Sequence, residues 1–299
     1  MDAHDIRRGI RFLEDHLRKP FIMEDAARES GYSLYHFCRL VTLASGLPPG
    51  EYVRKRRLSE AARDLAETGK PVGAIAREYT FQSHEAFTRS FKSLFGLSPE
   101  RYRRHTEPAR IMKPFALMED VRITDPLHLA GAPEIVLLPE STVAGPGFLC
   151  DLQSRTLDAD IRRHWERSAP LLREAAGGKY PDRRYGIGWP AAGTADDPVL
   201  EYLAGMEWDP RIRPPSAFRT FRIPAGPYLR AIHRGAPILE RETFLYLYGA
   251  YLPAASLQVR ASFDFDVYTE RFRPEEPENP DSEVDIFIPV ESSDSGLSE

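Results

Sequence analysis

Apolar residues in the first hundred positions recur with the period of a helix, and turn residues interrupt them at intervals. Ile6, Ile10, Leu13 and Leu17 fall on one face of a helix predicted over residues 5–18. The same periodicity predicts four more helices, at 23–30, 34–45, 51–67 and 72–79. A sixth helix is predicted to begin after Ser83. The N-terminal third of the chain is therefore expected to be all helical.

One local pattern occurs twice within this helical region. Residues 27–33 end in a serine and are followed by Phe37 and Arg39, and residues 76–83 end in a serine and are followed by Phe87 and Arg89. Each copy combines a small residue, a turn and a serine that can cap the next helix. These offsets are typical of a helix-turn-helix, whose second helix can enter a DNA major groove. Two copies predict a chain that reads two successive grooves as a monomer.

Alternating apolar positions predominate in the second half of the chain, where a weaker internal repeat is present. The first copy predicts a bent strand from Ile135, a helix and two strands, at 157–175, 185–189 and 200–208. The second copy predicts a bent strand from Phe218 and the same succession, at 238–252, 262–271 and 284–289. Strand, helix and hairpin in duplicate predict an antiparallel sheet with both helices on one face. We expect the other face to curve around a ligand between the copies.

These patterns predict a two-domain α+β protein. The first domain is all-α, with two helix-turn-helix units joined by a long helix. The second is a duplicated β-α-β-β domain with a mostly antiparallel sheet and two helices. We place the first domain at 1–108, a linker at 109–132, the second domain at 133–291 and a flexible tail at 292–299.

The charge of the chain changes sign between the two halves. The net charge is −5 over 299 residues, but residues 1–113 carry 21 Lys and Arg against 15 Asp and Glu, a net charge of +6. The remaining residues carry 19 and 30, a net charge of −11. A basic half suits a polyanion and an acidic half does not. The split supports DNA as a partner of the first domain alone.

Several classes of protein are not expected from this sequence. No run of about 18 apolar residues is present, and the charged N-terminus lacks a signal-peptide core, so we expect no membrane span and a cytoplasmic location. Cys38 and Cys150 form no CxxC pair, which predicts neither a metal site nor a disulfide. Hydrolase, NTPase and dinucleotide-binding motifs are absent, so we expect no cofactor and no enzyme.

The second helix-turn-helix carries the more specific motif of the first domain. The motif comprises Ile75-Ala76, Phe81, Phe87, Arg89, Phe91-Lys92, Phe95-Gly96, Ser98-Pro99 and Tyr102-Arg103. Residues 5–104 resemble the DNA-binding domain of the AraC/XylS family of transcription regulators. The resemblance implies groove-facing residues in both units, which by position are Tyr35, Cys38, Arg39, His84, Glu85, Thr88 and Arg89, with Lys92 exposed beside them. Arg56 and Arg57, in the densest cationic run, are the expected phosphate contacts.

Some of these positions allow more than one interpretation. Arg39 and Arg89 match guanine O6 and N7, but a helix-surface arginine also contacts phosphate or only solvent. The cationic run at 54–57 is equally a solvated helix face. Cys38 and Thr80 depart from the family, which has a longer polar residue and glycine there. A β-branched residue in a left-handed turn costs about 1 kcal/mol or more, so we expect the turn at Thr80 to differ in shape.

The second domain resembles the gyrase-inhibitor-like, or SOUL-type, effector-binding domain over residues 133–290. The segments that carry the resemblance are 223–226, 265–268 and 286–290. It implies a pocket between the two halves that takes an amphipathic or cationic small molecule, with Asp266 where the family usually has glutamate. The abundant aromatics supply a candidate wall, with Glu207 as a second candidate acid: Tyr268, Trp165, Trp189, Tyr202, Trp208 and Phe148.

Asp266 is either an exposed strand acid or a buried carboxylate among aromatics. A buried carboxylate costs several kcal/mol when unpaired and would await a cation, to which the rings add cation–π attraction. We expect a one-component regulator that binds double-stranded promoter DNA, a small-molecule effector and RNA polymerase. Two alternatives stay open for the second domain: a hydrolase that uses Asp266 or Glu207 with a tyrosine, and a module that sequesters another protein through its acidic face.

Overall fold

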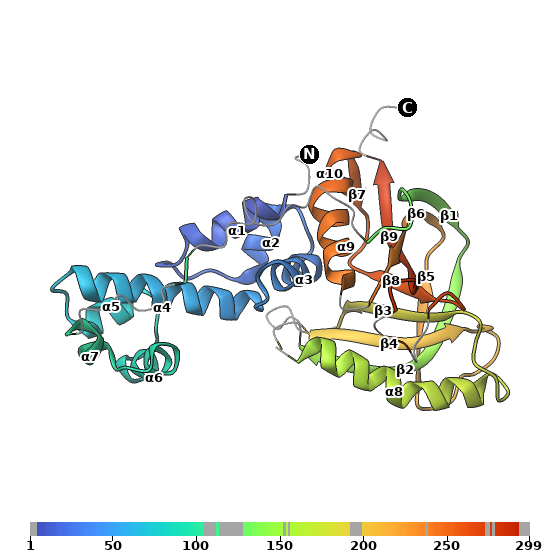
Figure 1. Cartoon of the computed structure of the whole chain (residues 1–299), viewed down its shortest axis with the longest axis horizontal. Helices are drawn as coiled ribbons and strands as arrows, with labels where there is room; N and C mark the ends of the chain where they lie inside the picture. Colours follow the sequence, from blue (N-terminus) through green and yellow to red (C-terminus); the bar gives the residue numbers. More distant parts are fainter. Residues whose placement is uncertain are drawn as a thin grey trace.

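A computed structural model describes residues 5–104, 112–113, 128–151, 154, 156–191, 199–236, 239–272, 276 and 279–292. Figure 1 shows a helical N-terminal body beside a sheet-based C-terminal body. Most of the predicted linker and the predicted tail lie outside the described residues. In the described part of the chain, every helix is too short or too polar to span a membrane.

The N-terminal body contains the two predicted helix-turn-helix units. The first comprises α1 (Ile6–Asp15), α2 (Met23–Ser30) and α3 (Leu34–Ser45), and the second comprises α5 (Val72–Glu78), α6 (His84–Phe95) and α7 (Pro99–Arg103). Between them runs α4 (Pro49–Glu67), whose 19 residues span about 28 Å. The side chains of Ser33 and Ser83 accept hydrogen bonds from backbone N–H groups of α3 and α6, as the sequence predicts.

The turns before α3 and α6 share a left-handed residue. Gly31 has φ 78°, which glycine adopts without strain, and Thr80 has φ 61°. The expectation that the turn at Thr80 differs in shape is therefore wrong. The Thr80 N–H donates to the carbonyl of Arg77 and the Phe81 N–H to that of Ala76, both at 3.0 Å, and these bonds hold the threonine in a strained conformation.

The C-terminal body has a nine-stranded sheet in the described residues, and every named pair in it is antiparallel. Its strands are β1 (Glu134–Leu138), β2 (Ser141–Asp151), β3 (Arg184–Pro190), β4 (Val199–Glu207), β5 (Phe218–Ile223), β6 (Gly226–Arg234), β7 (Leu257–Val259), β8 (Asp264–Tyr268) and β9 (Glu283–Ser292). The order is β1-β6-β9-β8-β3-β4-β2-β5, with β7 beside β9. In the internal repeat, β1, β2, β3 and β4 correspond to β5, β6, β8 and β9. Exchanging each strand for its counterpart gives the same order read backwards, so a pseudo-twofold axis passes between β3 and β8.

Helices from both copies cover the same face of the sheet. The first copy supplies α8 (Leu157–Ala175), whose bounds equal the predicted ones. The second supplies α9 (Glu240–Tyr246), which continues through the π-helical η2 (Leu247–Tyr251) into α10 (Leu252–Ala254). The opposite face is filled by its own apolar cluster, which includes Tyr185, Phe265 and Phe287. The expectation that this opposite face curves around a ligand is therefore wrong.

One apolar core crosses the boundary between the two bodies. Buried residues of the first helix-turn-helix unit, among them Leu13 and Phe37, belong to the same cluster as Phe244 and Tyr248 of the C-terminal body. The second helix-turn-helix unit has a separate core that includes Leu65, Phe87 and Phe91. The first unit is thus packed onto the sheet domain, whereas the second projects away from it (Figure 1).

Candidate functional site

The second helix-turn-helix unit presents its candidate DNA-reading residues to solvent. His84, Glu85, Arg89 and Lys92 are exposed along α6, and Thr88 is half-buried. The buried residues of this helix are Phe87 and Phe91, which face the unit's own core. The outer face of α6 is therefore accessible to a major groove, and the base contacts of these residues stay predictions.

The first unit differs, because its second helix lies against the C-terminal body. Tyr35 and Cys38 are 3% and 0% exposed, and Arg39 points into the neighbouring domain. α3 packs beside α9 and over β4, where Cys38 shares an apolar cluster with Leu200 and Tyr202. The expectation that Tyr35, Cys38 and Arg39 face a DNA groove is not met in this arrangement, since the sheet domain covers them.

Arg39 forms the polar centre of this contact. Its Nη1 donates to a carboxylate oxygen of Asp264 and to the hydroxyl of Tyr35 at 3.1 Å, and its guanidinium carbon lies 3.9 Å from the centroid of the Phe244 ring. Asp264 also accepts a hydrogen bond from the Tyr248 hydroxyl at 2.8 Å. Burial alone lowers the pKa of Arg39, but the negative charge of Asp264 more than offsets it, so the pKa lies well above its usual value.

Asp266 lies two residues beyond Asp264 on β8, so both side chains project from the helix-covered face of the sheet. The buried Oδ1 of Asp266 has no hydrogen-bond partner among the described residues. Burial raises the pKa of Asp266 to about 7; Arg39 lowers this pKa and the nearby Asp264 raises it further. Asp266 is thus half-buried with one enclosed oxygen, and it is not a fully solvated strand acid.

Three of the predicted wall residues lie around Asp266. The indole Nε1 of Trp165 donates to the hydroxyl of Tyr202 at 2.9 Å, and its ring lies 5.2 Å from that of Tyr268. Phe148 adjoins them, with its ring 5.9 Å from that of Tyr202.

Two glycines of β3 make room on this face of the sheet. Gly186 and Gly188 pair with Asp266 and Asp264 in register. A Cβ on Gly186 would lie 2.4 Å from the Tyr202 hydroxyl, and one on Gly188 would lie 3.1 Å from the Tyr35 hydroxyl. These glycines leave room for the hydroxyl ends of Tyr202 and Tyr35 beside the acids. We call the set Asp264, Asp266, Trp165, Tyr202, Phe244, Tyr248 and Tyr268 the carboxylate site.

Three other predicted ligand residues lie elsewhere. Trp189 is on the opposite face of the sheet, where its ring packs 4.6 Å from that of Phe221. Glu207 is exposed at the end of β4 and accepts a hydrogen bond from the Tyr185 hydroxyl. Trp208 packs near Phe218 and donates to the carbonyl of Ile212. These placements correct the expectation, because counting aromatics does not say which face of a strand each one occupies.

Asp264, Phe244 and Tyr248 were not among the expected ligand residues. A signal for Asp264 was present in the sequence, since strand alternation puts it on the same face as Asp266 and Tyr268. Phe263 and Phe265, which alternate with the acids, belong to the opposite core.

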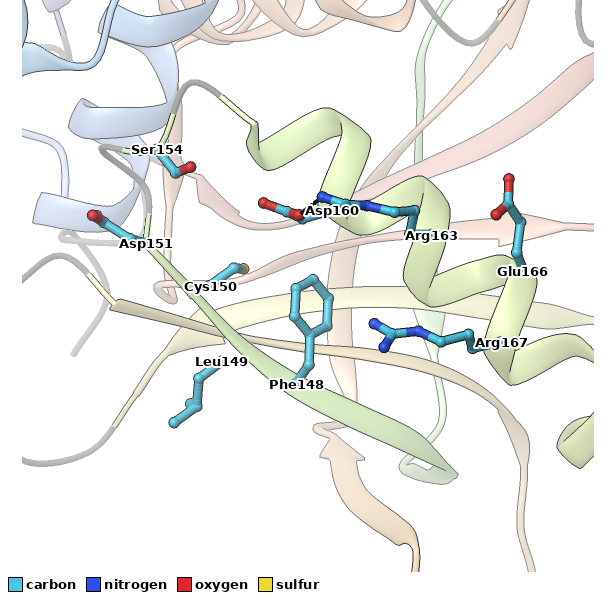
Figure 2. Close-up of a pocket in the computed structure, with 9 residues that line it drawn as sticks. All are labelled: Phe148, Leu149, Cys150, Asp151, Ser154, Asp160, Arg163, Glu166 and Arg167. Carbon is cyan, nitrogen blue, oxygen red and sulfur yellow. Dashed lines mark hydrogen bonds and ion pairs between the residues drawn. The ribbon is translucent and has the colours of Figure 1, made fainter.

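An open groove of about 640 Å³ lies between β2 and α8, outside the carboxylate site. Figure 2 shows it lined by Phe148, Leu149, Cys150, Asp151, Ser154, Asp160, Arg163, Glu166 and Arg167. Arg163 is already paired with Asp160 across one helical turn, so this lining offers little uncompensated charge. Within the described ranges, no cluster of three or more His, Cys, Asp or Glu has a metal-site arrangement.

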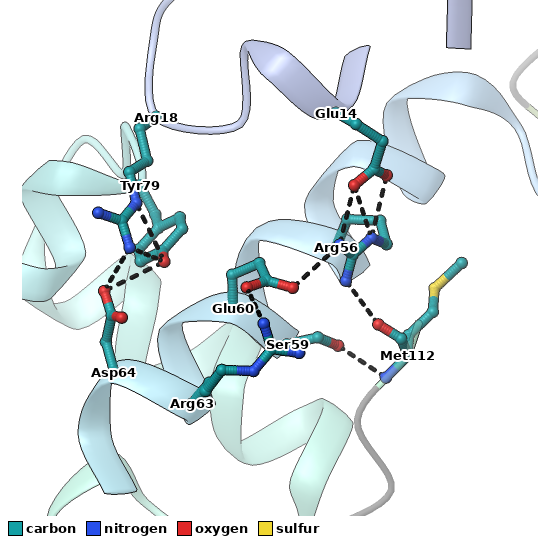
Figure 3. A network of polar contacts seen from close by, with 9 residues as sticks. All are labelled: Glu14, Arg18, Arg56, Ser59, Glu60, Arg63, Asp64, Tyr79 and Met112. Carbon is teal, nitrogen blue, oxygen red and sulfur yellow. Dashed lines mark hydrogen bonds and ion pairs between the residues drawn. The ribbon is translucent and has the colours of Figure 1, made fainter. Parts of the chain in front are cut away.

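Arg56 is buried and fully engaged, contrary to the prediction of a phosphate contact. Its guanidinium donates to Glu14 of α1, to Glu60 of α4 and to the carbonyl of Met112 (Figure 3). The Met112 N–H in turn donates to the Ser59 hydroxyl at 3.0 Å. Arg56 therefore fastens α1 and the segment at Met112 onto α4.

Arg57, on the same helix α4, is half-buried. It donates to the carbonyl of Lys19 at 3.1 Å, and its guanidinium carbon lies 5.6 Å from the centroid of the Phe21 ring. Burial lowers its pKa. This placement ties Arg57 to the segment after α1, and its phosphate contact stays a prediction.

Comparisons with known proteins match the two bodies separately and together. A helix-turn-helix domain model matches residues 26–105, and the family model described as integron-associated effector binding protein matches residues 134–290. The right origin-binding protein of Escherichia coli strain K12 is 28% identical over 274 residues, which cover 88% of this chain and 89% of that protein. The multiple antibiotic resistance protein MarA of the same strain is 35% identical over 102 residues, covering 34% of this chain and 80% of MarA. A solved integron cassette protein from Vibrio cholerae has 16% identity and a TM-score of 0.39, over 56% of this chain and 100% of that chain.

Proposed function

The chain belongs to the family of integron-associated effector-binding proteins, and we propose that its second domain senses an amphipathic cation and thereby controls the first. The resemblances to AraC/XylS regulators and to gyrase-inhibitor-like domains are confirmed. The chain is an AraC-type DNA-binding transcription regulator with an effector-binding domain.

The pair of carboxylates at the pseudo-twofold axis is the observation that supports a cationic ligand. Asp264 and Asp266 project side by side among the rings of Trp165, Tyr202 and Tyr268. Two like charges in a desolvated place repel each other and attract a counter-cation. Aromatic faces add cation–π attraction. A hydrophobic cation at this position would pair with a carboxylate and contact aromatic faces at the same time.

Thermal unfolding of the full chain tests the ligand class. We expect tetraphenylphosphonium to raise the melting temperature, because a ligand that binds the folded state alone stabilises it. Triphenylphosphine oxide, which has three of the same rings and no charge, is the matched ligand control. Asp266→Asn should weaken cation binding by about tenfold or more, whereas Asp285→Asn, at a buried acid paired with Arg230 on β6, should leave it unchanged. Equal stabilisation by the neutral compound would refute a charge-based site.

The same samples separate a sensor from the two alternatives. A sensor returns its ligand unchanged, whereas a hydrolase consumes a susceptible ester or amide of similar shape. Glu207 lies on the opposite face of the sheet from Asp266, so a hydrolase could not use the two acids together. A sequestering module would bind a protein through its acidic surface and would show no response to small cations. Loss of compound over time, measured by chromatography, would argue for the hydrolase.

We propose promoter DNA and RNA polymerase as the macromolecular partners. α6 offers His84, Glu85 and Arg89 to a groove, and a 19-residue spacer of about 28 Å places a second unit close to one helical turn away. Binding to duplexes selected from random DNA should fall steeply with salt through counterion release. Addition of polymerase to the selected complex should give a slower-migrating ternary complex. A duplex affinity that does not change with salt would contradict the DNA interface.

A further inference from the structure

α3 of the DNA-binding domain lies over the carboxylate site. The Tyr35 hydroxyl rests above Gly188, next to the pseudo-twofold axis, and donates to Asp264 at 3.3 Å. Arg39 reaches the same carboxylate, and the ring of His36 lies 5.2 Å from that of Tyr248. The helix is thus seated on the groups that would receive the ligand.

The chemistry of this contact is that of an amphipathic cation. The Arg39 guanidinium bonds Asp264 and stacks over the Phe244 ring, while Tyr35 and Cys38 supply the apolar part. The site has two carboxylates, and α3 brings one guanidinium to them. Asp266 keeps a buried oxygen without a hydrogen-bond partner among the described residues. The seated helix therefore leaves this oxygen unsatisfied, and a ligand cation that also reaches Asp266 makes a contact that the helix does not make.

Seating on the site and reading of DNA exclude each other for α3. The residues that contact the sheet domain, Tyr35, Cys38 and Arg39, are those that the resemblance to AraC/XylS regulators assigns to a major groove. One face of a helix cannot contact the sheet domain and a base edge at the same time. In this arrangement the second helix of the first unit, α3, is covered, and the second helix of the other unit, α6, is accessible to DNA.

We propose that α3 and the effector are alternative occupants of the carboxylate site, with Arg39 as the resident cation. Binding of an aryl or lipophilic cation displaces α3 and frees the first helix-turn-helix unit to enter a second major groove. This inference rests on the proposed sensor function and adds a mechanism by which ligand binding changes DNA binding. Ligand binding and two-groove DNA binding are then favoured by the same displaced state, so each strengthens the other.

Hydrogen exchange on the full chain tests the displacement directly. The probe is phenylguanidinium, which reproduces the guanidinium and ring of the Arg39–Phe244 contact, and phenylurea is its neutral control. At saturating phenylguanidinium we expect the amides of α3 to exchange about tenfold faster or more, because they lose their cover. The amides of α6 should not change. A bound probe that leaves α3 as protected as before would overturn the inference.

Asp264→Asn tests the inference without any ligand. Removing the carboxylate that holds Arg39 should raise exchange in α3, extend the footprint on DNA by about one helical turn, roughly 10 bp, and tighten DNA binding severalfold. Asp285→Asn is the matched control, since Asp285 is equally buried but bonds Arg230 and Arg271 within the sheet domain. A change of the same size in both variants would mean general loosening of the domain and would count against displacement.

Gly188→Ala provides a second variant that keeps every charge. Its Cβ would lie 3.1 Å from the Tyr35 hydroxyl and 3.2 Å from Cδ1 of Leu200, so it would crowd the seated helix from the sheet side. We expect a smaller change in the same direction as with Asp264→Asn, with thermal unfolding confirming that the variant is folded. Unchanged exchange in α3 in both folded variants would refute the inference.

Failure of this inference and failure of the sensor proposal give different results. If no cation stabilises the chain but Asp264→Asn frees α3 and lengthens the footprint, the sensor proposal fails and the seating of α3 as a block on DNA stands. If cations bind and α3 stays protected, the sensor stands and the displacement is wrong.

Discussion

α3 and α6 are both twelve-residue helices that follow a serine cap, yet seven residues of α3 are buried and two of α6 are. Each carries an arginine at the same offset from its cap: Arg39 is bonded to a carboxylate of another domain, and Arg89 is exposed. The core of the first unit continues into the sheet domain, whereas that of the second closes on itself. A shared motif thus specifies the shape of a helix-turn-helix, and the neighbouring domain decides whether its second helix is available.

The largest expected effect is the loss of stability when Arg39 is removed, compared with removal of its counterpart Arg89. Arg39→Ala should lower the free energy of unfolding of the full chain by about 3–5 kcal/mol, because it leaves Asp264, 3% exposed, without its cation. Arg89→Ala should change it by less than about 0.5 kcal/mol, as expected at an exposed position. Urea titrations of the three proteins measure both. Equal losses would mean that the seating of α3 adds nothing to stability.

A second test uses acid to weaken the sheet domain that covers α3. His233 is 0% exposed and bonded to Thr243 of α9, and burial lowers its pKa to about 4. A lowered pKa in the folded state means that this group's contribution to stability is complete above pH 6.5 and decreases as the pH falls toward 4. The full shift corresponds to about 3 kcal/mol.

Asp266 has the opposite pH dependence, because a raised pKa means that its contribution is complete below pH 3.8 and is lost as the pH rises through about 7. We therefore compare wild type with His233→Gln, in which Asp266 is unchanged. The difference in their unfolding free energies should shrink as the pH falls from 7 to 4.5, and exchange in α3 should respond more than exchange in α6. Parallel curves for the two proteins would contradict the assignment to His233.

An effect of intermediate size is expected on the base preference of DNA binding, and it distinguishes the two helix-turn-helix units. In the full chain without ligand, Arg89→Ala should weaken specific binding by about 1–3 kcal/mol and relax preference at one position, as loss of a bidentate base contact does. Arg39→Ala should leave the preference unaltered in the half-site read by α6. Selection from random DNA with each variant gives the result. Unaltered preference with Arg89→Ala would show that α6 is oriented differently from our assignment.

The smallest effect concerns the turns before the two helices. Thr80→Gly should stabilise the second unit by about 1 kcal/mol, because glycine removes the strain of a left-handed β-branched residue, although it adds freedom to the unfolded chain. Gly31→Ala in the first unit should destabilise by a similar amount for the same reason. Thermal unfolding of both variants tests the pair. A destabilised Thr80→Gly would mean that threonine side-chain contacts outweigh the strain.

Local sequence patterns predicted the bounds of helices better than they predicted which residues those helices contact. The bounds of α3 and α8 equal the predicted ranges, since caps, turns and helical periodicity are all short-range. Arg39 and Asp264 are 225 positions apart, and nothing in a local pattern couples them. The burial of Arg56 could have been predicted from helical spacing, although the run of charged residues at 54–57 suggested an exposed face. Arg56 lies four residues after Tyr52 and three before Ser59, and both of these are buried on the same side of α4.

The anchoring of Met112 to α4 limits how far a displaced helix can travel. The Ser59 and Arg56 contacts fix the chain at Met112 and Lys113, and fifteen residues later His128 contacts the sheet domain. Whatever path these residues take, they span at most about 50 Å. If the seated state is populated about 99 to 1, every ligand binds about a hundredfold more weakly than to an empty site. The population of the seated state therefore sets the ligand concentration at which the regulator responds.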